Sequence, residues 1–205
     1  MSRLDLHNST DLDDRRLARL AAEGIAGWAV GTLTVRVRYS RSADFSGTCF
    51  YADRRIYVNL GRHLVYPYRL ATHLARAATI GRSWYKPAYV IEIADAYQLV
   101  AFVFMHELYH LLVKRARRNT RQKESMCDRF AARFVVDRFG LGVFDPVGRP
   151  VPRGEWDFQD LERFVDAARD RRVRPLVGGA PLFSPSVARS ARAPSSAARI
   201  GKAHA

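Results

Sequence analysis

The sequence predicts one α+β domain over residues 10–172, with a small, mostly antiparallel sheet packed on a central helix and on the helix that follows it. Three observations support this class. Residues 99–113 are mostly apolar, as expected of a helix that is buried on nearly all sides. Residues 33–39 alternate apolar and polar side chains, which is the pattern of a half-buried strand. Residues 48–51 and 55–59 have the composition of strands and are separated by a short turn, which favours a hairpin.

The central helix is expected to begin after Asp95, because an Asp followed three residues later by Gln98 is typical of a capping box. Basic residues at 114–118 suit its C-terminal end, where the helix dipole favours positive charge. A second helix is expected to begin near Asn119 and to end at Gly140. The short connection between them would fold the second helix back on the first.

The pentapeptide HELYH at residues 106–110 lies inside the central helix. Positions i and i+4 share one helix face, so His106 and His110 can bind the same ion. Glu107 lies about 100° round the helix axis, beside the ion and not bound to it. Two imidazoles on a metal and a carboxylate close to the metal-bound water are the requirements of metal-assisted hydrolysis. The pentapeptide therefore predicts a zinc site with Glu107 as the general base.

The second helix offers two carboxylates, Glu124 and Asp128, which are again four residues apart and share a face. Glu124 is the expected third metal ligand. Asp128 is expected to accept the outer N–H of a ligating histidine, an interaction that orients the ring. Because Asp128 is also a carboxylate one turn away, it is the alternative third ligand.

Together, residues 106–110 and the pattern Glu124-x-x-Cys127-Asp128 resemble the motifs of gluzincin metallopeptidases, among them the ImmA/IrrE-like group of small zinc peptidases. The resemblance covers residues 99–135. It implies a minimal zincin-like fold, a single Zn²⁺ ion and hydrolysis of peptide bonds. It also implies that His106, His110 and Glu124 bind the ion. Cys127 departs from the usual Ala, and Tyr109 stands where small residues are common, so a narrower cleft floor is expected.

A shorter similarity, over residues 47–51 and 56–59, is to the strands of SprT-like metalloproteases. Those proteins use a third histidine as ligand, whereas this chain offers Glu124. SprT-like proteins are therefore a neighbour in fold.

The remaining segments complete the predicted domain. Residues 1–9 are expected to be a flexible start, followed by a helix to about Glu23. Residues 62–80 are expected to form a helix with Pro67 in its first turn, and residues 89–93 a strand that leads into the central helix. A small amphipathic helix is expected over 157–172. The basic segment 173–205 has the composition of a disordered tail.

Composition gives only broad limits on compartment and partners. The formal net charge is +14, from 34 Lys+Arg against 20 Asp+Glu, which is compatible with a nucleic-acid partner of the basic surface or tail. Charge spread along the whole chain is equally compatible with no such partner. We expect no signal peptide or membrane span, and two cysteines are too few for a disulfide framework. A cytoplasmic location follows as the simplest expectation. The sequence carries no signal for the oligomeric state.

The predicted function is zinc-dependent cleavage of a protein or peptide, with a specific intracellular protein as one candidate substrate. The oxyanion needs a donor besides zinc, for which Tyr109, Tyr97, Tyr89 and His73 are the candidates. In zincin folds a substrate adds to an edge strand, and residues 89–93 or 56–59 could take that place. The alternative function is a non-catalytic, zinc-stabilised module with a degenerate peptidase site that binds DNA or a protein.

Overall fold

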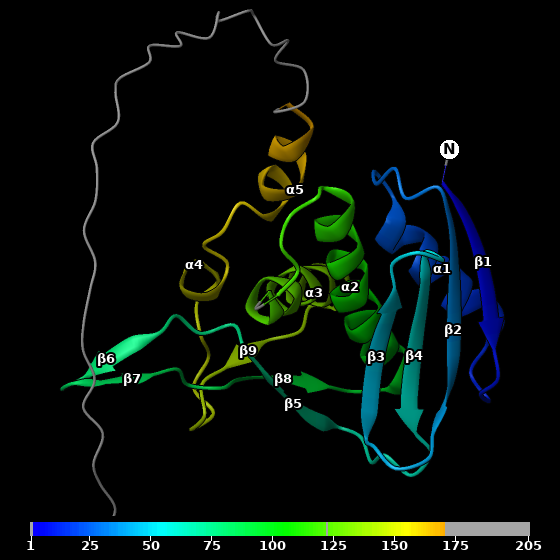
Figure 1. Cartoon of the computed structure of the whole chain (residues 1–205). Helices are drawn as coiled ribbons and strands as arrows, with labels where there is room; N and C mark the ends of the chain where they lie inside the picture. The colour runs from blue at the N-terminus through cyan, green and yellow to red at the C-terminus, as the bar shows by residue number, and fades with distance from the viewer. Residues whose placement is uncertain (1, 122, 171–205) are drawn as a thin grey trace, which may run out of the picture. The chain divides into compact units, whose positions relative to one another are not determined.

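The structure is a computed structural model that describes residues 2–121 and 123–170. Figure 1 shows its helices and strands. The strands are β1 (Arg3–Asn8), β2 (Thr32–Ser40), β3 (Phe45–Phe50), β4 (Arg55–Gly61), β5 (Tyr68–Thr72), β6 (Ala78–Ile80), β7 (Ser83–Tyr85), β8 (Tyr89–Ile93) and β9 (Val143–Phe144). The helices are α1 (Asp14–Ile25), α2 (Ala96–Arg115), α3 (Glu124–Phe139), α4 (Arg153–Trp156) and α5 (Leu161–Asp170). The predicted α+β class is confirmed, and the predicted tail 173–205 lies outside the described residues.

The larger sheet has four strands in the order β1-β2-β4-β3. The pairs β1–β2 and β2–β4 are parallel, and only β3–β4 is antiparallel, as the predicted hairpin requires. The expectation of a mostly antiparallel sheet is therefore wrong for this sheet. A flexible start was also expected, but residues 3–8 form β1, in which Leu4 and Leu6 turn toward the core while Arg3 and Asp5 are exposed.

A second sheet has three antiparallel strands in the order β5-β8-β9, and β6 and β7 form a separate hairpin. The helix expected over 62–80 is wrong. Within that range Leu70 and Thr72 are buried while Arg69 and Ala71 are exposed, so the side chains alternate with a period of two. Pairing with β8 supplies backbone hydrogen-bond partners that a helix would otherwise have provided.

Helix α2 is the centre of the hydrophobic core, and α3 packs against it. Its N-cap is Asp95, whose carboxylate accepts from the backbone N–H of Gln98, as predicted. Of the described residues, α2 is the one helix that is long and apolar enough to cross a membrane, and most of it is buried inside the fold. Helix α3 begins later than expected, at Glu124, and the Asn119 side chain accepts from Arg121 N–H in the segment before it. It ends at Gly140, whose backbone is left-handed.

The four-stranded sheet buries one face against α1 and α2. Apolar residues of β2 and β4 point toward this face and are almost fully buried: Leu33, Val35, Val37, Ile56, Val58 and Leu60. In β3, Phe45, Gly47 and Cys49 are paired with Leu60, Val58 and Ile56, and so lie on the same face. Strand β3 is one of the two edges of the sheet, and its inner face lies over α2.

Candidate metal centre

Two imidazoles from successive turns of α2 point toward the same place. The Nε2 atoms of His106 and His110 are 3.2 Å apart, and both rings are mostly buried. Four residues separate them along an unbroken helix, which is why the sequence alone could place them on one face. Both nitrogens therefore point toward a single position.

A carboxylate from α3 reaches the same position. Glu124 Oε2 is 3.2 Å from His106 Nε2, and Glu124 Oε1 is 3.4 Å from His110 Nε2. Ligand atoms about 2.0–2.1 Å from a tetrahedral zinc ion lie about 3.3 Å from one another. The three measured separations thus fit the donor spacing of a zinc site. The hydrogen bond with His106 is the main reason why the pKa of Glu124 is lowered to about 2, so this carboxylate is ionised.

A sulfur donor lies close by. His106, His110 and Cys127 each offer a ligand atom, and these atoms all lie within 4.8 Å of one another. This buried group could hold a metal ion. Burial raises the pKa of the Cys127 thiol, which works against the thiolate form that binds metals.

Asp128 joins two histidines. Its Oδ1 is 2.8 Å from His106 Nδ1, and its Oδ2 accepts from the backbone N–H of His73 at 2.7 Å and lies 2.9 Å from His73 Nδ1. Burial alone would raise the pKa of Asp128, but the bonds from His106 and His73 outweigh it and lower the pKa. A carboxylate on the outer nitrogen fixes the ring so that Nε2 faces the donor cluster. The position expected for Asp128 is thus the one it occupies.

Glu107 lies beside the cluster and is buried against β3. A Cβ atom at Gly47 would come within 2.3 Å of Glu107 Oε1 and 2.6 Å of Glu107 Cγ, so only a glycine leaves room for this side chain. Burial raises the pKa of Glu107 to about 7, although the nearby His106 opposes the shift. A carboxyl group with this pKa can take up and return a proton near neutral pH.

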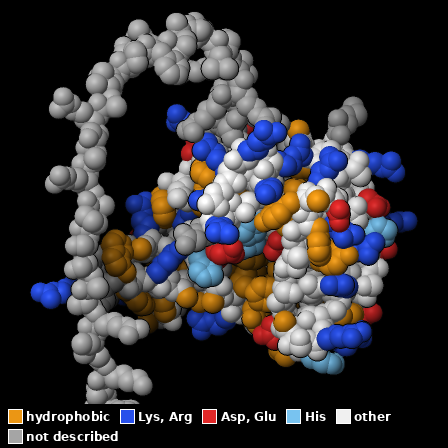
Figure 2. All heavy atoms as spheres, in the orientation of Figure 1, with side chains coloured by type: hydrophobic (Ala, Val, Ile, Leu, Met, Phe, Trp, Pro, Cys, Tyr) orange, Lys and Arg blue, Asp and Glu red, His pale blue; other side chains and the backbone are white. Residues whose placement is uncertain are grey.

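His73, His106, Glu107, Glu124 and Asp128 line one pocket between the two sheets and the two long helices. Its walls are formed by Phe45, Gly47, Leu70, Ala71, His73, Phe102, Val103, His106, Glu107, Glu124 and Asp128. Figure 2 shows histidine and acidic side chains side by side at a depression near the middle of the visible face. A ligand can therefore reach the donor cluster from solvent.

Comparison with protein families, curated proteins and solved structures finds no match for this chain. The residues and their geometry are accordingly the whole basis for a functional conclusion. What they establish is a buried group of histidines with a cysteine, on α2 and α3, that could hold a metal ion.

The three tyrosines named as candidate oxyanion donors, Tyr109, Tyr97 and Tyr89, are not among the residues that line this pocket. Tyr109 is fully buried, its hydroxyl donates to the Leu161 carbonyl at 2.9 Å, and its ring packs on Phe130. It therefore fills the core behind the helix and does not narrow the cleft floor. The Tyr97 hydroxyl accepts from Asp13 N–H at 2.9 Å, close to the start of α2. Both hydroxyls therefore bond to backbone groups outside the pocket.

His73 lines the pocket of the donor cluster, a position that the sequence pattern did not predict. Expected on a helix, it instead follows β5 and enters the pocket with its imidazole exposed. The one signal was its residue type, because its partner Asp128 is 55 positions away.

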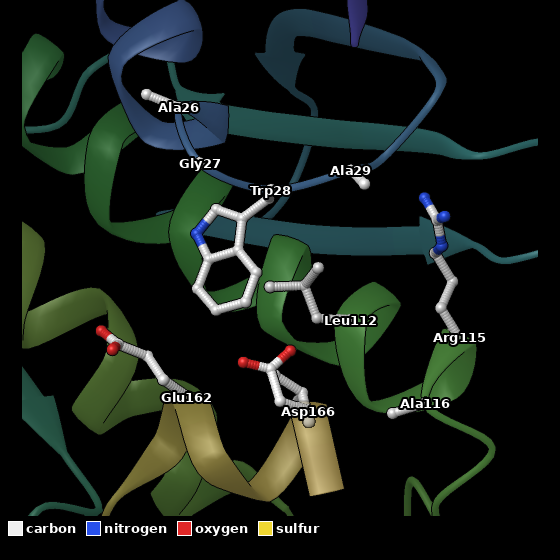
Figure 3. Close-up of a pocket in the computed structure, with 10 residues that line it drawn as sticks. Ala26, Gly27, Trp28, Ala29, Leu112, Arg115, Ala116, Glu162 and Asp166 are labelled. Carbon is white, nitrogen blue, oxygen red and sulfur yellow. The ribbon is translucent and has the colours of Figure 1, made fainter. Parts of the chain in front are cut away.

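A separate pocket lies where the loop after α1, the end of α2 and α5 meet. Figure 3 shows the Trp28 indole over this pocket, with Glu162 and Asp166 rising toward it from α5. None of its lining residues belongs to the donor cluster, and it contains no histidine. We assign no chemistry to it.

Proposed function

We propose that this protein is a zinc-dependent peptidase that hydrolyses peptide bonds of a specific intracellular protein. The observation that carries this proposal is the mutual spacing of His106 Nε2, His110 Nε2 and the Glu124 carboxylate, at 3.2–3.4 Å, with a buried Glu107 beside them. Two histidines and a carboxylate are the protein ligands of a catalytic zinc site that keeps one position open. When bound, zinc lowers the pKa of its water toward neutrality and polarises a substrate carbonyl.

Glu124 is the better third ligand than Cys127. Its carboxylate is ionised and exposed toward the pocket, and both of its oxygens face an Nε2 atom. Cys127 is buried, and its thiol would have to lose a proton in surroundings that raise its pKa. We therefore propose Glu124 as the ligand and Cys127 as a small packing residue beside it.

Glu107 is proposed as the general base. Its carboxylate lies next to the ligand cluster without a position in the ligand set, and its pKa of about 7 suits proton transfer in both directions. It would take a proton from the attacking water and pass it to the leaving nitrogen.

His73 is proposed as the donor to the oxyanion, in place of Tyr109 and Tyr97. Asp128 holds its backbone N–H and its Nδ1, which leaves Nε2 free. In its protonated form the ring can donate from Nε2 into the pocket that also contains Glu107 and Glu124. Asp128 would thus orient the ligand His106 through Oδ1 and the oxyanion donor His73 through Oδ2.

Strand β3 is proposed as the edge to which the substrate adds. The strands expected in this role, β4 and β8, are both interior. Gly61 N–H bonds the Asp44 carbonyl, so by the alternation of an antiparallel ladder the backbone groups of Phe45, Gly47 and Cys49 point away from β4. An extended peptide paired with these groups would pass beside Glu107.

The test is cleavage of a mixture of cellular peptides, read by mass spectrometry as new N-termini. Peptides are used because a peptidase with one folded partner would leave general protein substrates intact. We expect cleavage by the zinc-loaded protein, loss of cleavage after chelation, and recovery when zinc is added. A mixture without any zinc-dependent cleavage would overturn the proposal and favour the non-catalytic binding module.

Gly47→Ala is predicted to lower hydrolysis by about 100-fold while zinc still binds, because the new Cβ would push the Glu107 carboxylate from its place and small displacements of reacting groups are costly. The groups that must shift are the far end of a flexible side chain, so the fold should persist. Thr48→Ala, on the exposed face of the same strand, is the matched control. Equal hydrolysis by the two variants would mean that Glu107 does not act from the position it occupies here.

A further inference from the structure

The outer face of the four-stranded sheet carries a group of arginine and aromatic side chains. In the register of the sheet, Arg36 of β2 lies beside Tyr57 of β4, and Arg55 of β4 lies beside Phe50 of β3. Arg38 follows Arg36 by two residues in β2 and therefore lies on the same face. We call these five residues the arginine–aromatic face. Residues that alternate with them along β2 and β4, Val35, Val37 and Ile56, point the other way, into the core.

Positive charge on this face is only partly compensated. Arg36 and Arg38 are exposed, and within residues 2–121 and 123–170 neither has an acidic partner. Arg38 donates to the Asn59 side chain at 2.6 Å, which fixes its direction without neutralising it. Arg55 pairs with Asp53 at 2.9 Å. The face therefore presents at least two guanidinium groups that are free to bind anions.

The aromatic rings lie among these guanidinium groups. The guanidinium carbons of Arg38, Arg55 and Arg36 are 4.5, 5.3 and 5.8 Å from the centre of the Tyr57 ring. The Arg55 group is also 4.8 Å from the Phe50 ring, and the two rings meet edge to face at 4.9 Å. Phe50 is one of the few large apolar side chains that are exposed. Figure 2 shows basic side chains between hydrophobic ones over the strands at the right of Figure 1.

We propose that the arginine–aromatic face binds single-stranded nucleic acid. The exposed Phe50 ring and the half-buried Tyr57 ring can accept stacked bases, guanidinium planes also stack on bases, and the free arginines bind phosphates. Sequence-tolerant binding with a strong dependence on salt is the behaviour expected of such a surface. Among the described residues, this face is made of strands, without a helix that could enter the major groove of a duplex. This inference is independent of the proposed peptidase activity.

The experiment measures anisotropy of fluorescein-labelled oligo(dT) with the full chain. Arg36→Ala/Arg38→Ala should weaken binding at least about 10-fold and reduce the slope of log K against log salt by about 1.4, since each phosphate contact on a single strand contributes about 0.7. The control is Arg15→Ala/Arg19→Ala, which removes the same charge from exposed positions of α1. All variants keep residues 171–205, so a difference between them reports on the sheet.

Stacking is tested separately at Tyr57. Tyr57→Phe keeps the ring and should bind as the wild type does, whereas Tyr57→Leu should lose about 10-fold in affinity. The proposal is overturned if both double variants lose affinity equally, because binding would then follow net charge alone. It is also overturned if the two Tyr57 variants bind alike, or if polyglutamate competes as well as an unlabelled oligonucleotide does.

Discussion

Glu107→Gln is expected to lower hydrolysis by about 10²–10⁴-fold and to leave zinc binding intact, because the amide cannot accept a proton and the side chain is outside the ligand set. The substitution keeps the shape of a side chain that is buried against Gly47, so it should not disturb the packing of β3 on α2. Hydrolysis of a peptide identified in the mixture, together with the zinc content of each preparation, gives the two measurements.

The same variant separates the peptidase from a binding module that keeps zinc only for stability. A structural site needs its ligands and has no use for a base. If wild type and Glu107→Gln release the same new N-termini at the same rate, the cleavage comes from another enzyme or from another site. If Glu107→Gln loses zinc as well as hydrolysis, Glu107 also supports zinc binding. That result would not be expected from the structure, in which Glu107 takes no part in the three close contacts among His106, His110 and Glu124.

The parts of the fold that followed from the sequence are those specified by near neighbours. The capping residues of α2, the i and i+4 spacing of His106 and His110, and the hairpin of β3 and β4 all depend on residues within a few positions of one another. The pairing of α2 with α3 also followed, since the short connection allows few other arrangements. The contact between Asp128 and His106 could be expected because α2 and α3 follow each other in the chain and the motif fixes both positions.

The failures concern contacts between distant segments. Residues 3–8 are short and partly polar, and only parallel pairing with β2 makes them a strand. Residues 68–72 carry a misleading helical pattern, because the apolar spacing of four between Leu70 and Leu74 also occurs in a strand followed by a loop. The position of His73 after β5 and the place of β3 at an edge beside the pocket both depend on strand pairing between segments that are distant in the sequence. The direction of Tyr109 depended on α5, whose carbonyl at Leu161 its hydroxyl contacts.

Glu124→Ala is expected to lower zinc affinity by more than about 100-fold and to abolish hydrolysis. Loss of a residue that only orients a ligand typically costs 10–100-fold, and loss of a ligand should cost more. The Glu124 side chain is exposed, so its removal opens no cavity in the core, and thermal unfolding of the metal-free protein should be nearly unchanged. Zinc per chain and competition with a chelator of known affinity provide the measurements.

Cys127→Ser is the matched variant, since it removes the other donor near the two imidazoles and keeps the side chain small. If Glu124 is the ligand, Cys127→Ser retains zinc, and Asp128→Ala weakens binding only by the smaller factor expected of a residue that orients His106. Zinc lost in Cys127→Ser and kept in Glu124→Ala would assign a His-His-Cys site. Zinc kept in Glu124→Ala and lost in Asp128→Ala would mean that Asp128, and not Glu124, is the carboxylate ligand. Either result would contradict the proposed hydrolytic site, because that site uses Glu124 as its third ligand. The Glu124 oxygens lie 3.2 Å from His106 Nε2 and 3.4 Å from His110 Nε2.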